Sequence, residues 1–207
     1  MRSFSITELP LKGVRAVVFD LDGTLYDKRR LPLRLVVGDL RHVFLLAAER
    51  IARRRLRGCY YGTGEKFYKE LYAQMSRLCG VSPKRAQQWY EQDYMPLMVR
   101  LLERYYNVDS FVVPLLKELR RRGILTVVFS DYGLVDDKLR ALGADPELFD
   151  FRLAAPDMGG LKPNRQLFEK VLSEVGVSAG EALMAGDRED TDGEGARAVG
   201  MRYINVN

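Results

Sequence analysis

The chain has 207 residues, 47% of them hydrophobic and 29% charged, which suffices for a sizeable core in one domain, or in one domain with an insert. Its net charge of +5 suits anionic ligands but does not choose among phosphate esters, nucleic acid and a membrane surface. Two cysteines without CxxC spacing and a single histidine argue against a disulfide framework or a zinc site. Residues 1–13 lack the apolar core of a signal peptide, and no apolar run reaches transmembrane length. We therefore expect a cytoplasmic protein without a membrane partner.

The first predicted element is a buried strand over residues 14–19, which is short, apolar and rich in valine. It ends at Asp20-Leu21-Asp22-Gly23-Thr24. Residues two apart on an extended backbone point to the same side, so the carboxylates of Asp20 and Asp22 can reach one site. Two crowded anions are costly unless they share a cation, a proton or an electrophile. This pattern favours metal-assisted nucleophilic chemistry over a role in packing.

The next part of the chain contains helical patterns only. They predict helices over residues 33–56, 63–78, 83–94 and 96–105, with Pro96 breaking or restarting the helix. A purely helical insert directly after the first strand is best explained as a separate cap over the edge of a sheet. We therefore expect a helical cap at residues 27–109 and a core formed by residues 1–26 and 110–207.

After the insert, strands and helices alternate. Strands are predicted at residues 124–129, 151–154, 182–185 and 203–206, and helices at residues 111–122, 135–142, 163–175 and 190–199, with Pro163 in the first turn of the third helix. This alternation predicts an α/β fold, a Rossmann-like three-layer core with a parallel sheet and an inserted all-helical cap. The strands deliver Asp20, Ser130 and Asp187 to one rim of the sheet, where ligands bind in such folds.

These residues resemble the four motifs of the haloacid dehalogenase superfamily of phosphohydrolases. The similarity is to the phosphoglycolate phosphatase-like subgroup, which carries a helical cap between its first and second motifs. The run from Asp20 to Thr24 matches the DxDGT motif, and Ser130 matches the second motif. Lys162 matches the third motif, and Gly186-Asp187 followed by Asp192 matches the GDxxxxD form of the fourth.

The resemblance implies a role for each matched residue. Asp20 is the expected nucleophile, which becomes an aspartyl phosphate, and Asp22 is the expected general acid and base. Thr24, Ser130 and Lys162 are expected to hold the phosphoryl oxygens. Mg²⁺ is the expected cofactor, because it prefers oxygen ligands. Its expected site consists of Asp20, Asp22, Asp187 and Asp192.

Three positions qualify this resemblance. The superfamily's dehalogenases carry tyrosine in place of Asp22, and a halide leaving group needs no proton, so the aspartate favours phosphate esters. Asp131 stands where many relatives have asparagine; it is expected to be an exposed helix cap, or a carboxylate paired by Lys138 or Arg188. In the acid-rich fourth motif, the spacing favours Asp192 over Asp190 as the second acid.

The cap is expected to choose the substrate. Its first part is basic, and the candidate specificity residues are Arg53, Arg54, Arg57, Tyr60 and Tyr61, although a solvated helix face and a plain loop explain the same residues. We predict a magnesium-dependent phosphatase for a small phosphorylated metabolite, as a monomer or homodimer. The alternatives are a phosphomutase of the same superfamily and a noncatalytic module whose basic cap binds nucleic acid or an acidic protein. The filled motifs favour the enzyme, and no nucleic-acid partner is expected.

Overall fold

The centre of the protein is a five-stranded parallel sheet. The computed structural model describes residue 7 and residues 9–206, so part of the segment expected to open the core, and residue 207, lie outside the described residues. The strand order is β3-β2-β1-β4-β5, so the direction of winding reverses beside β1. The strands are β1 (Ala16–Phe19), β2 (Leu125–Ser130), β3 (Phe151–Ala154), β4 (Ala182–Gly186) and β5 (Arg202–Asn205).

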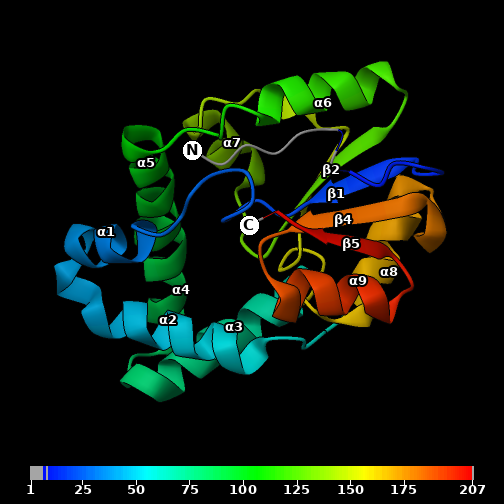
Figure 1. Cartoon of the computed structure of the whole chain (residues 1–207). Helices are drawn as coiled ribbons and strands as arrows, with labels where there is room; N and C mark the ends of the chain where they lie inside the picture. The colour runs from blue at the N-terminus through cyan, green and yellow to red at the C-terminus, as the bar shows by residue number, and fades with distance from the viewer. Residues whose placement is uncertain (1–6, 8, 207) are drawn as a thin grey trace.

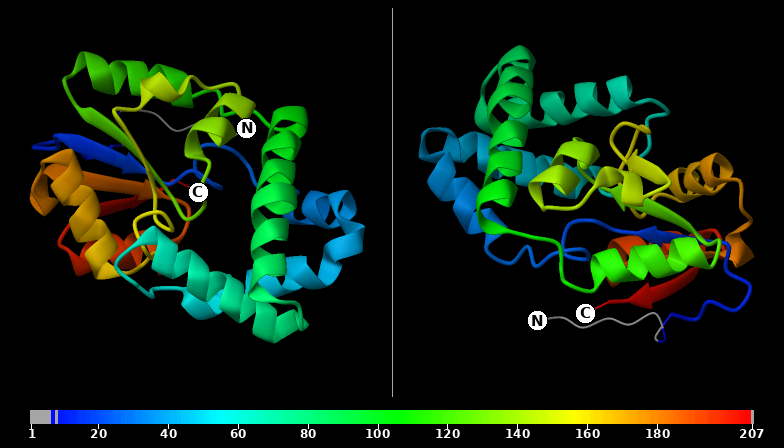
Figure 2. Two further views of the ribbon diagram at one scale, coloured as in Figure 1. Left: turned by 180° about the vertical axis from the view of Figure 1, so that it is seen from behind. Right: turned by 90° about the horizontal axis from the view of Figure 1, so that it is seen from above.

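Helices cover both faces of this sheet. In Figure 1, α6 and α7 lie above the sheet and α8 and α9 lie below it, and Figure 2 shows the same layers from behind and from above. Val17 and Phe19 of β1 join one hydrophobic cluster, whereas Ala16 and Val18 join the other. Both faces of β1 are therefore buried, and the Rossmann-like α/β fold is confirmed. The helices are α6 (Val112–Arg121), α7 (Val135–Ala141), α8 (Arg165–Val175) and α9 (Glu194–Ala198).

A helical segment lies between β1 and β2 and gathers on one side of the sheet (Figure 1). Its core contains fully buried aromatic and aliphatic side chains, among them Trp89, Phe67 and Leu71. Among the described residues, no helix has the length and hydropathy that crossing a membrane requires. The helices of the segment are α1 (Leu31–Gly38), α2 (Val43–Leu56), α3 (Gly64–Cys79), α4 (Pro83–Trp89) and α5 (Met95–Tyr105).

The single long helix expected over residues 33–56 is wrong, because the first α-helix ends at Gly38 and the next α-helix begins at Val43. Asp39 leaves the helical region, with φ −142° and ψ 54°. Its carboxylate accepts a hydrogen bond from Trp89 Nε1 at 2.8 Å and lies 2.8 Å from Nδ1 of His42. These tertiary contacts outweigh the helical pattern of the local sequence.

Of three expectations about helix ends, the one about Pro163 is wrong. Pro96 restarts the helix, which is one of the two outcomes expected for it: α4 passes through a π-helical turn, Tyr90–Tyr94, into α5, and Pro96 lies in the first turn of α5. Pro163 precedes α8, because Asn164 caps that helix by accepting from the backbone N–H of Gln166 at 2.9 Å. The helix expected over residues 190–199 begins with a π-helical turn, Glu189–Gly193, before α9.

Candidate active site

The carboxyl end of β1 holds Asp20 between two donors. Lys162 Nζ donates to Asp20 Oδ1 at 2.7 Å, and Thr24 Oγ1 donates to Asp20 Oδ2 at 2.9 Å. All three residues are buried, yet both carboxylate oxygens are satisfied. Asp20 is thereby fixed in orientation, with its negative charge partly offset by the lysine.

Two further aspartates from the end of β4 meet Asp20. Asp20, Asp187 and Asp192 each present an oxygen, and these oxygens lie within 4.8 Å of one another. Burial raises the pKa of Asp192 to about 7, and the negative charge of Asp20 adds to this rise while Lys162 opposes it. Burial and Asp20 also raise the pKa of Asp187. The three crowded carboxylates form the all-oxygen donor set that suits a hard divalent cation.

Close backbone approach makes this cluster possible. A Cβ on Gly186 would lie 2.4 Å from Asp192 Oδ2, and a Cβ on Gly23 would lie 2.4 Å from Asp187 Oδ2. Gly23 also has φ +103°, a left-handed conformation that favours glycine. The two glycines of the motifs therefore leave room for the carboxylates.

Two lysines supply the positive charge of the cluster. Burial alone would lower the pKa of Lys162, but the carboxylates of Asp192 and Asp20 hold it well above its ordinary value. Lys162 Nζ lies 2.6 Å from Asp192 Oδ1. Lys28 Nζ lies 2.9 Å from Asp187 Oδ2 and also donates to the backbone carbonyl of Asp22. Lys28 was not predicted from the sequence, where its only signal is its position shortly after the first motif.

The side chain of Asp22 does not join the carboxylate cluster, so its expected role as a side-chain metal ligand is corrected. Its Oδ2 accepts from Lys138 and from Ser130 Oγ at 3.1 Å, and its Oδ1 accepts from Tyr26 Oη at 2.7 Å. Burial would raise the pKa of Asp22, but the charge and hydrogen bond of Lys138, together with Tyr26, hold it below its ordinary value. Asp22 is therefore kept as an oriented carboxylate.

Ser130 and Asp131 occupy the end of β2. Ser130 Oγ donates to Asp22 and accepts from the backbone N–H of Tyr132 at 3.0 Å. The expected exposed helix cap at Asp131 is wrong, because Asp131 Oδ1 accepts from the backbone N–H of Lys162 at 3.0 Å. The suggested pairing of Asp131 with Lys138 is also wrong, since Lys138 binds Asp22. Asp131 instead ties the end of β2 to the lysine loop.

Asp190 and Asp192, the two acids considered for the fourth motif, have separate environments. Asp192 is 1% exposed and lies in the carboxylate cluster. Asp190 points to the surface, where Arg188 Nη2 lies 2.8 Å from its Oδ2 and Arg57 contacts the same oxygen. The spacing argument for Asp192 agrees with this placement. Arg57 joins the cap to the core through Asp190.

A family model described as haloacid dehalogenase-like hydrolase matches residues 14–200. The chain belongs to this family. It is 30% identical to haloacid dehalogenase-like hydrolase domain-containing protein 3 of Mus musculus over 150 residues, which make up 70% of this chain and 57% of the mouse protein. The match thus spans little more than half the length of that relative. The expected membership of the haloacid dehalogenase superfamily, and with it the expectation of an enzyme, is confirmed.

Two further similarities extend over most of the hydrolase. It is 26% identical to the glyceraldehyde 3-phosphate phosphatase of Methanopyrus kandleri over 212 residues, covering 93% of this chain and 84% of that protein. It also resembles the 2-haloacid dehalogenase from Pseudomonas syringae, with a TM-score of 0.64 and 23% identity over 93% of this chain and 86% of that one. The second similarity shows the fold alone. The first supports phosphatase activity at low identity.

The candidate specificity residues of the hydrolase fall into three groups. Arg53 is buried and donates to the carbonyl of Asp131 at 2.7 Å, to Glu49 and to the hydroxyl of Tyr90, so it joins cap to core. It also lines the cavity beside Asp22 and Lys162, and its expected role in specificity stays a prediction. Arg54 is exposed, and its guanidinium makes no hydrogen bond or ion pair with the described residues. Arg57 is held by Asp190. Arg54 is therefore the arginine best placed to bind a ligand.

Neither Tyr60 nor Tyr61 lines the cavity that contains Asp22 and Lys162, so their expected role in substrate choice stays a prediction. The backbone N–H of Tyr61 donates to the carbonyl of Gly159 at 2.7 Å, and Tyr60 forms an isolated β-bridge with Gly160. This loop therefore packs against the core loop that precedes Lys162. These contacts connect the loop to the segment that carries Lys162.

A cavity of about 720 Å³ connects the catalytic rim with the cap. Asp22, Lys162 and Arg188 line it on the core side, and residues of α1, α2 and α5 line it on the cap side, including Arg54. Asp20 is not itself a lining residue, but it accepts a hydrogen bond from Lys162, which is one. A ligand in this cavity can contact Asp22 and Lys162 on the core side and the helices of the cap on the other side.

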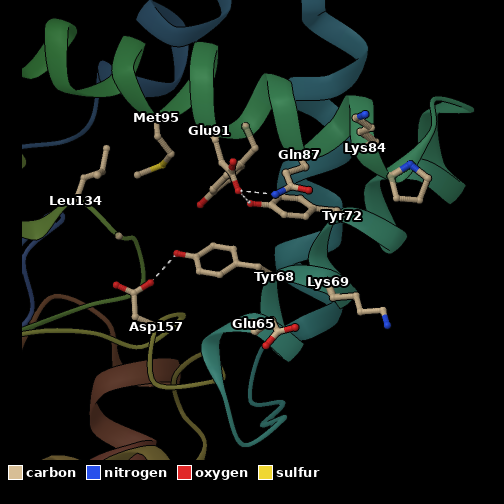
Figure 3. Close-up of a pocket in the computed structure, with 13 residues that line it drawn as sticks. Glu65, Tyr68, Lys69, Tyr72, Lys84, Gln87, Glu91, Met95, Leu134 and Asp157 are labelled. Carbon is tan, nitrogen blue, oxygen red and sulfur yellow. Dashed lines mark hydrogen bonds between the residues drawn. The ribbon is translucent and has the colours of Figure 1, made fainter.

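A second cavity, of about 910 Å³, lies elsewhere, between α3 and the α4–α5 helices and next to the core residues Leu134 and Asp157 (Figure 3). Tyr68 Oη donates to Asp157 Oδ1 at 2.9 Å, and Tyr72 Oη donates to Glu91 Oε1 at 3.0 Å. None of the motif residues lines this cavity. The chemistry of the hydrolase is therefore assigned to the smaller cavity.

Proposed function

We propose that this hydrolase is a magnesium-dependent phosphatase that cleaves a small phosphorylated metabolite through an aspartyl phosphate on Asp20. The observation that carries the proposal is the placement of Asp20 between Lys162 and Thr24, beside Asp187 and Asp192. This is the arrangement that a carboxylate nucleophile needs when its target is anionic. Similarity to proteins named as phosphatases supports the same conclusion.

In the first step, a carboxylate oxygen of Asp20 attacks phosphorus, forming a P–O bond as the bond to the leaving oxygen breaks. Lys162 offsets the charge of the nucleophile and remains hydrogen-bonded to it at 2.7 Å. Thr24 fixes the other carboxylate oxygen at 2.9 Å, so the attack needs little reorganisation of the side chain. Asp20, Asp187 and Asp192 would hold Mg²⁺, which would supply positive charge that reduces repulsion between the nucleophile and the phosphate.

Asp22 serves both proton transfers. Its lowered pKa makes it a carboxylate in the free enzyme, which is the form that deprotonates the water attacking the aspartyl phosphate. For the first step it must carry a proton to the leaving alkoxide. A dianionic phosphate bound beside Asp22 raises the pKa of that carboxyl, because it places negative charge nearby. Binding of substrate thus favours the protonated form when it is needed.

The test is a screen of purified protein against phosphorylated metabolites, with magnesium and with excess chelator. Release of phosphate should require magnesium and should vanish in Asp20→Asn, while circular dichroism shows that this variant is folded. Phosphate release by folded Asp20→Asn at the wild-type rate would exclude the proposed nucleophile.

The same screen separates hydrolysis from the phosphomutase alternative. Phosphorus NMR of each sugar phosphate reports whether free phosphate or a positional isomer accumulates. Free phosphate supports the phosphatase, whereas an isomer formed without phosphate release contradicts it. Binding of nucleic acid with no turnover of any phosphate ester would favour the noncatalytic module, and its affinity should then fall steeply with salt.

A further inference from the structure

The residues of α2 that line the cavity beside Asp22 and Lys162 change from aliphatic to positively charged along the helix. Its cavity-lining residues recur at helical spacing and so occupy one face. At the N-terminal end of α2 these are Val43, Leu46 and Ala47, and toward the C-terminal end they are Arg50, Arg53 and Arg54, followed by Arg57 directly after the helix. With a rise of about 1.5 Å per residue, the fourteen-residue helix carries this gradient over roughly 21 Å.

The apolar end is widened by two other cap helices. Leu31, Leu35 and Val36 of α1 and Met98 of α5 line the same cavity. Leu31, Leu35 and Met98 are buried, whereas Val36 is 36% exposed. The apolar wall therefore includes buried residues as well as Val36 and Val43, of which Val43 is 40% exposed.

The charged end adjoins the catalytic rim. Arg57 is bound to Asp190 of the core, next to Arg188, and Lys162 lines the cavity on the core side. The one carboxylate that the apolar half of α2 contributes to the cavity, Glu49, is paired with Arg53. The cavity thus offers cations beside Asp22 and aliphatic side chains along α1 and the N-terminal half of α2. Arg29, which precedes α1 and also lines the cavity, is paired with Asp27. A ligand that is hydrophilic along its whole length therefore fits this cavity less well than a ligand with one charged end and one apolar end.

We propose that the substrate is an amphiphilic phosphate monoester, whose phosphate lies at Asp20 and Lys162 and whose apolar chain lies along α1 and α2. This inference rests on the proposed phosphatase function and specifies its substrate class. The argument is charge complementarity at one end and burial of apolar surface at the other. Each methylene placed against Leu35, Val36 and Val43 leaves water, which favours binding.

The test uses alkylphosphonates, which keep the phosphate-like head but cannot be hydrolysed. Binding of ethyl-, butyl- and octylphosphonate to the wild-type protein is measured by calorimetry with magnesium, below the concentration at which micelles form. The dissociation constant should fall roughly three- to fourfold for each methylene that becomes buried. From ethyl to octyl, the total gain should reach about a hundredfold or more.

Two adjacent residues of α2 provide a matched pair of variants. Val43 lines the cavity, whereas Phe44 is 77% exposed and does not line it. Val43→Asp places a charge beside the proposed chain and should abolish most of the gain with chain length. Phe44→Asp makes the same change of charge outside the cavity and should retain the gain.

The outcomes separate this inference from the proposed function. Equal affinity for ethyl- and octylphosphonate overturns the inference, and so does an equal loss in Val43→Asp and Phe44→Asp, which would indicate nonspecific adsorption. Hydrolysis of ethyl phosphate is measured alongside. If it occurs while chain length has no effect, the phosphatase stands and the amphiphilic substrate is wrong. If phosphonate binding depends on chain length but no phosphate ester is hydrolysed, the phosphatase is wrong and the apolar channel stands.

Discussion

Lys138 of α7 donates to Asp22, 116 positions earlier in the chain, and the side chain of this lysine is completely buried. Asp22 is the carboxylate that we assign to proton transfer. A buried cation beside it stabilises the charged form and fixes the side chain in one orientation. The pair therefore links the packing of α7 to the chemistry at the end of β1.

We predict that Lys138→Met moves the acidic limb of the pH profile of aspartyl-phosphate hydrolysis to higher pH. In the wild type the pKa of Asp22 lies below its ordinary value, because Lys138 and Tyr26 outweigh the effect of burial. Without the lysine, burial dominates and raises this pKa, so the base form that activates water is lost at a higher pH. The measurement is the steady-state rate that follows the pre-steady-state burst, recorded against pH for both proteins. An acidic limb at the same pH in both proteins would show that Asp22 is not the base of this step.

Stability gives an independent measure of the same pair. A carboxyl with a lowered pKa in the folded state contributes stability above its unfolded pKa, and this contribution is lost as pH falls through the folded value. Breaking a buried pair by removing one partner costs about 3–5 kcal/mol. Urea unfolding at neutral pH should therefore show a large loss for Lys138→Met. The double variant Lys138→Met/Asp22→Asn should recover part of it, since no charge is then left buried alone.

Asp22→Asn should impair substrates with poor leaving groups more than substrates with good ones. An aryl phosphate leaves with little protonation, whereas an alkoxide needs an acid. The step that expels the leaving group must be isolated by a pre-steady-state burst, because the attack of water also uses Asp22. Equal losses for p-nitrophenyl phosphate and an alkyl phosphate in that step would argue against Asp22 as general acid.

Magnesium binding should strengthen as pH rises from 6 to 8. The pKa of Asp192 is about 7, raised by burial and by Asp20, so protons compete with the cation below that pH. Calorimetric titration of magnesium at several pH values measures this dependence. Asp187→Ala should weaken binding at every pH through the loss of a carboxylate ligand, and excess chelator should silence the wild type. Full activity in chelator would contradict the metal site.

The sequence predicted the site residues that follow the ends of strands. It did not predict the site residues that tertiary packing brings to the site. Asp20 and Ser130 follow apolar strands, and the carboxyl ends of parallel strands share one rim, so their proximity could be inferred before the fold was known. Lys138 is different. It lies one turn after Val135 and next to Leu139, on the buried face of α7, and this spacing is the signal that could have revealed a buried lysine.

The cap was predicted less well for a physical reason. A run of arginines has the same helical pattern whether each side chain faces water, a ligand or the core. Arg53 and Arg54 are adjacent in α2, yet one is buried against Asp131 and Tyr90 and the other is exposed. The break at Asp39 likewise depends on Trp89, which lies 50 positions away. Local periodicity contains no information about such partners.

Arg53 and Arg54 therefore provide a test of where the cap acts on substrate. Arg53→Gln removes a charge that is paired with Glu49 and hydrogen-bonded across the cap–core contact, so it should lower the melting temperature and activity toward every substrate alike. Arg54→Gln should leave the melting temperature unchanged. It should lower kcat/KM for the substrate found by the screen by about 1–3 kcal/mol, roughly 5- to 150-fold, the cost of a lost hydrogen bond to a charged group.

The control for both variants is p-nitrophenyl phosphate, which is too small to reach far along α2. Arg54→Gln should barely change its turnover, because the phosphate is held by core residues such as Lys162. Tyr60→Phe and Tyr61→Phe should affect neither substrate, since both tyrosines pack against the core loop at Gly159 and Gly160. If Arg54→Gln impairs both substrates equally, Arg54 supports the chemistry and not the choice of substrate. If it impairs neither, Arg54 belongs to a solvated helix face and specificity depends on the apolar wall of the cavity alone.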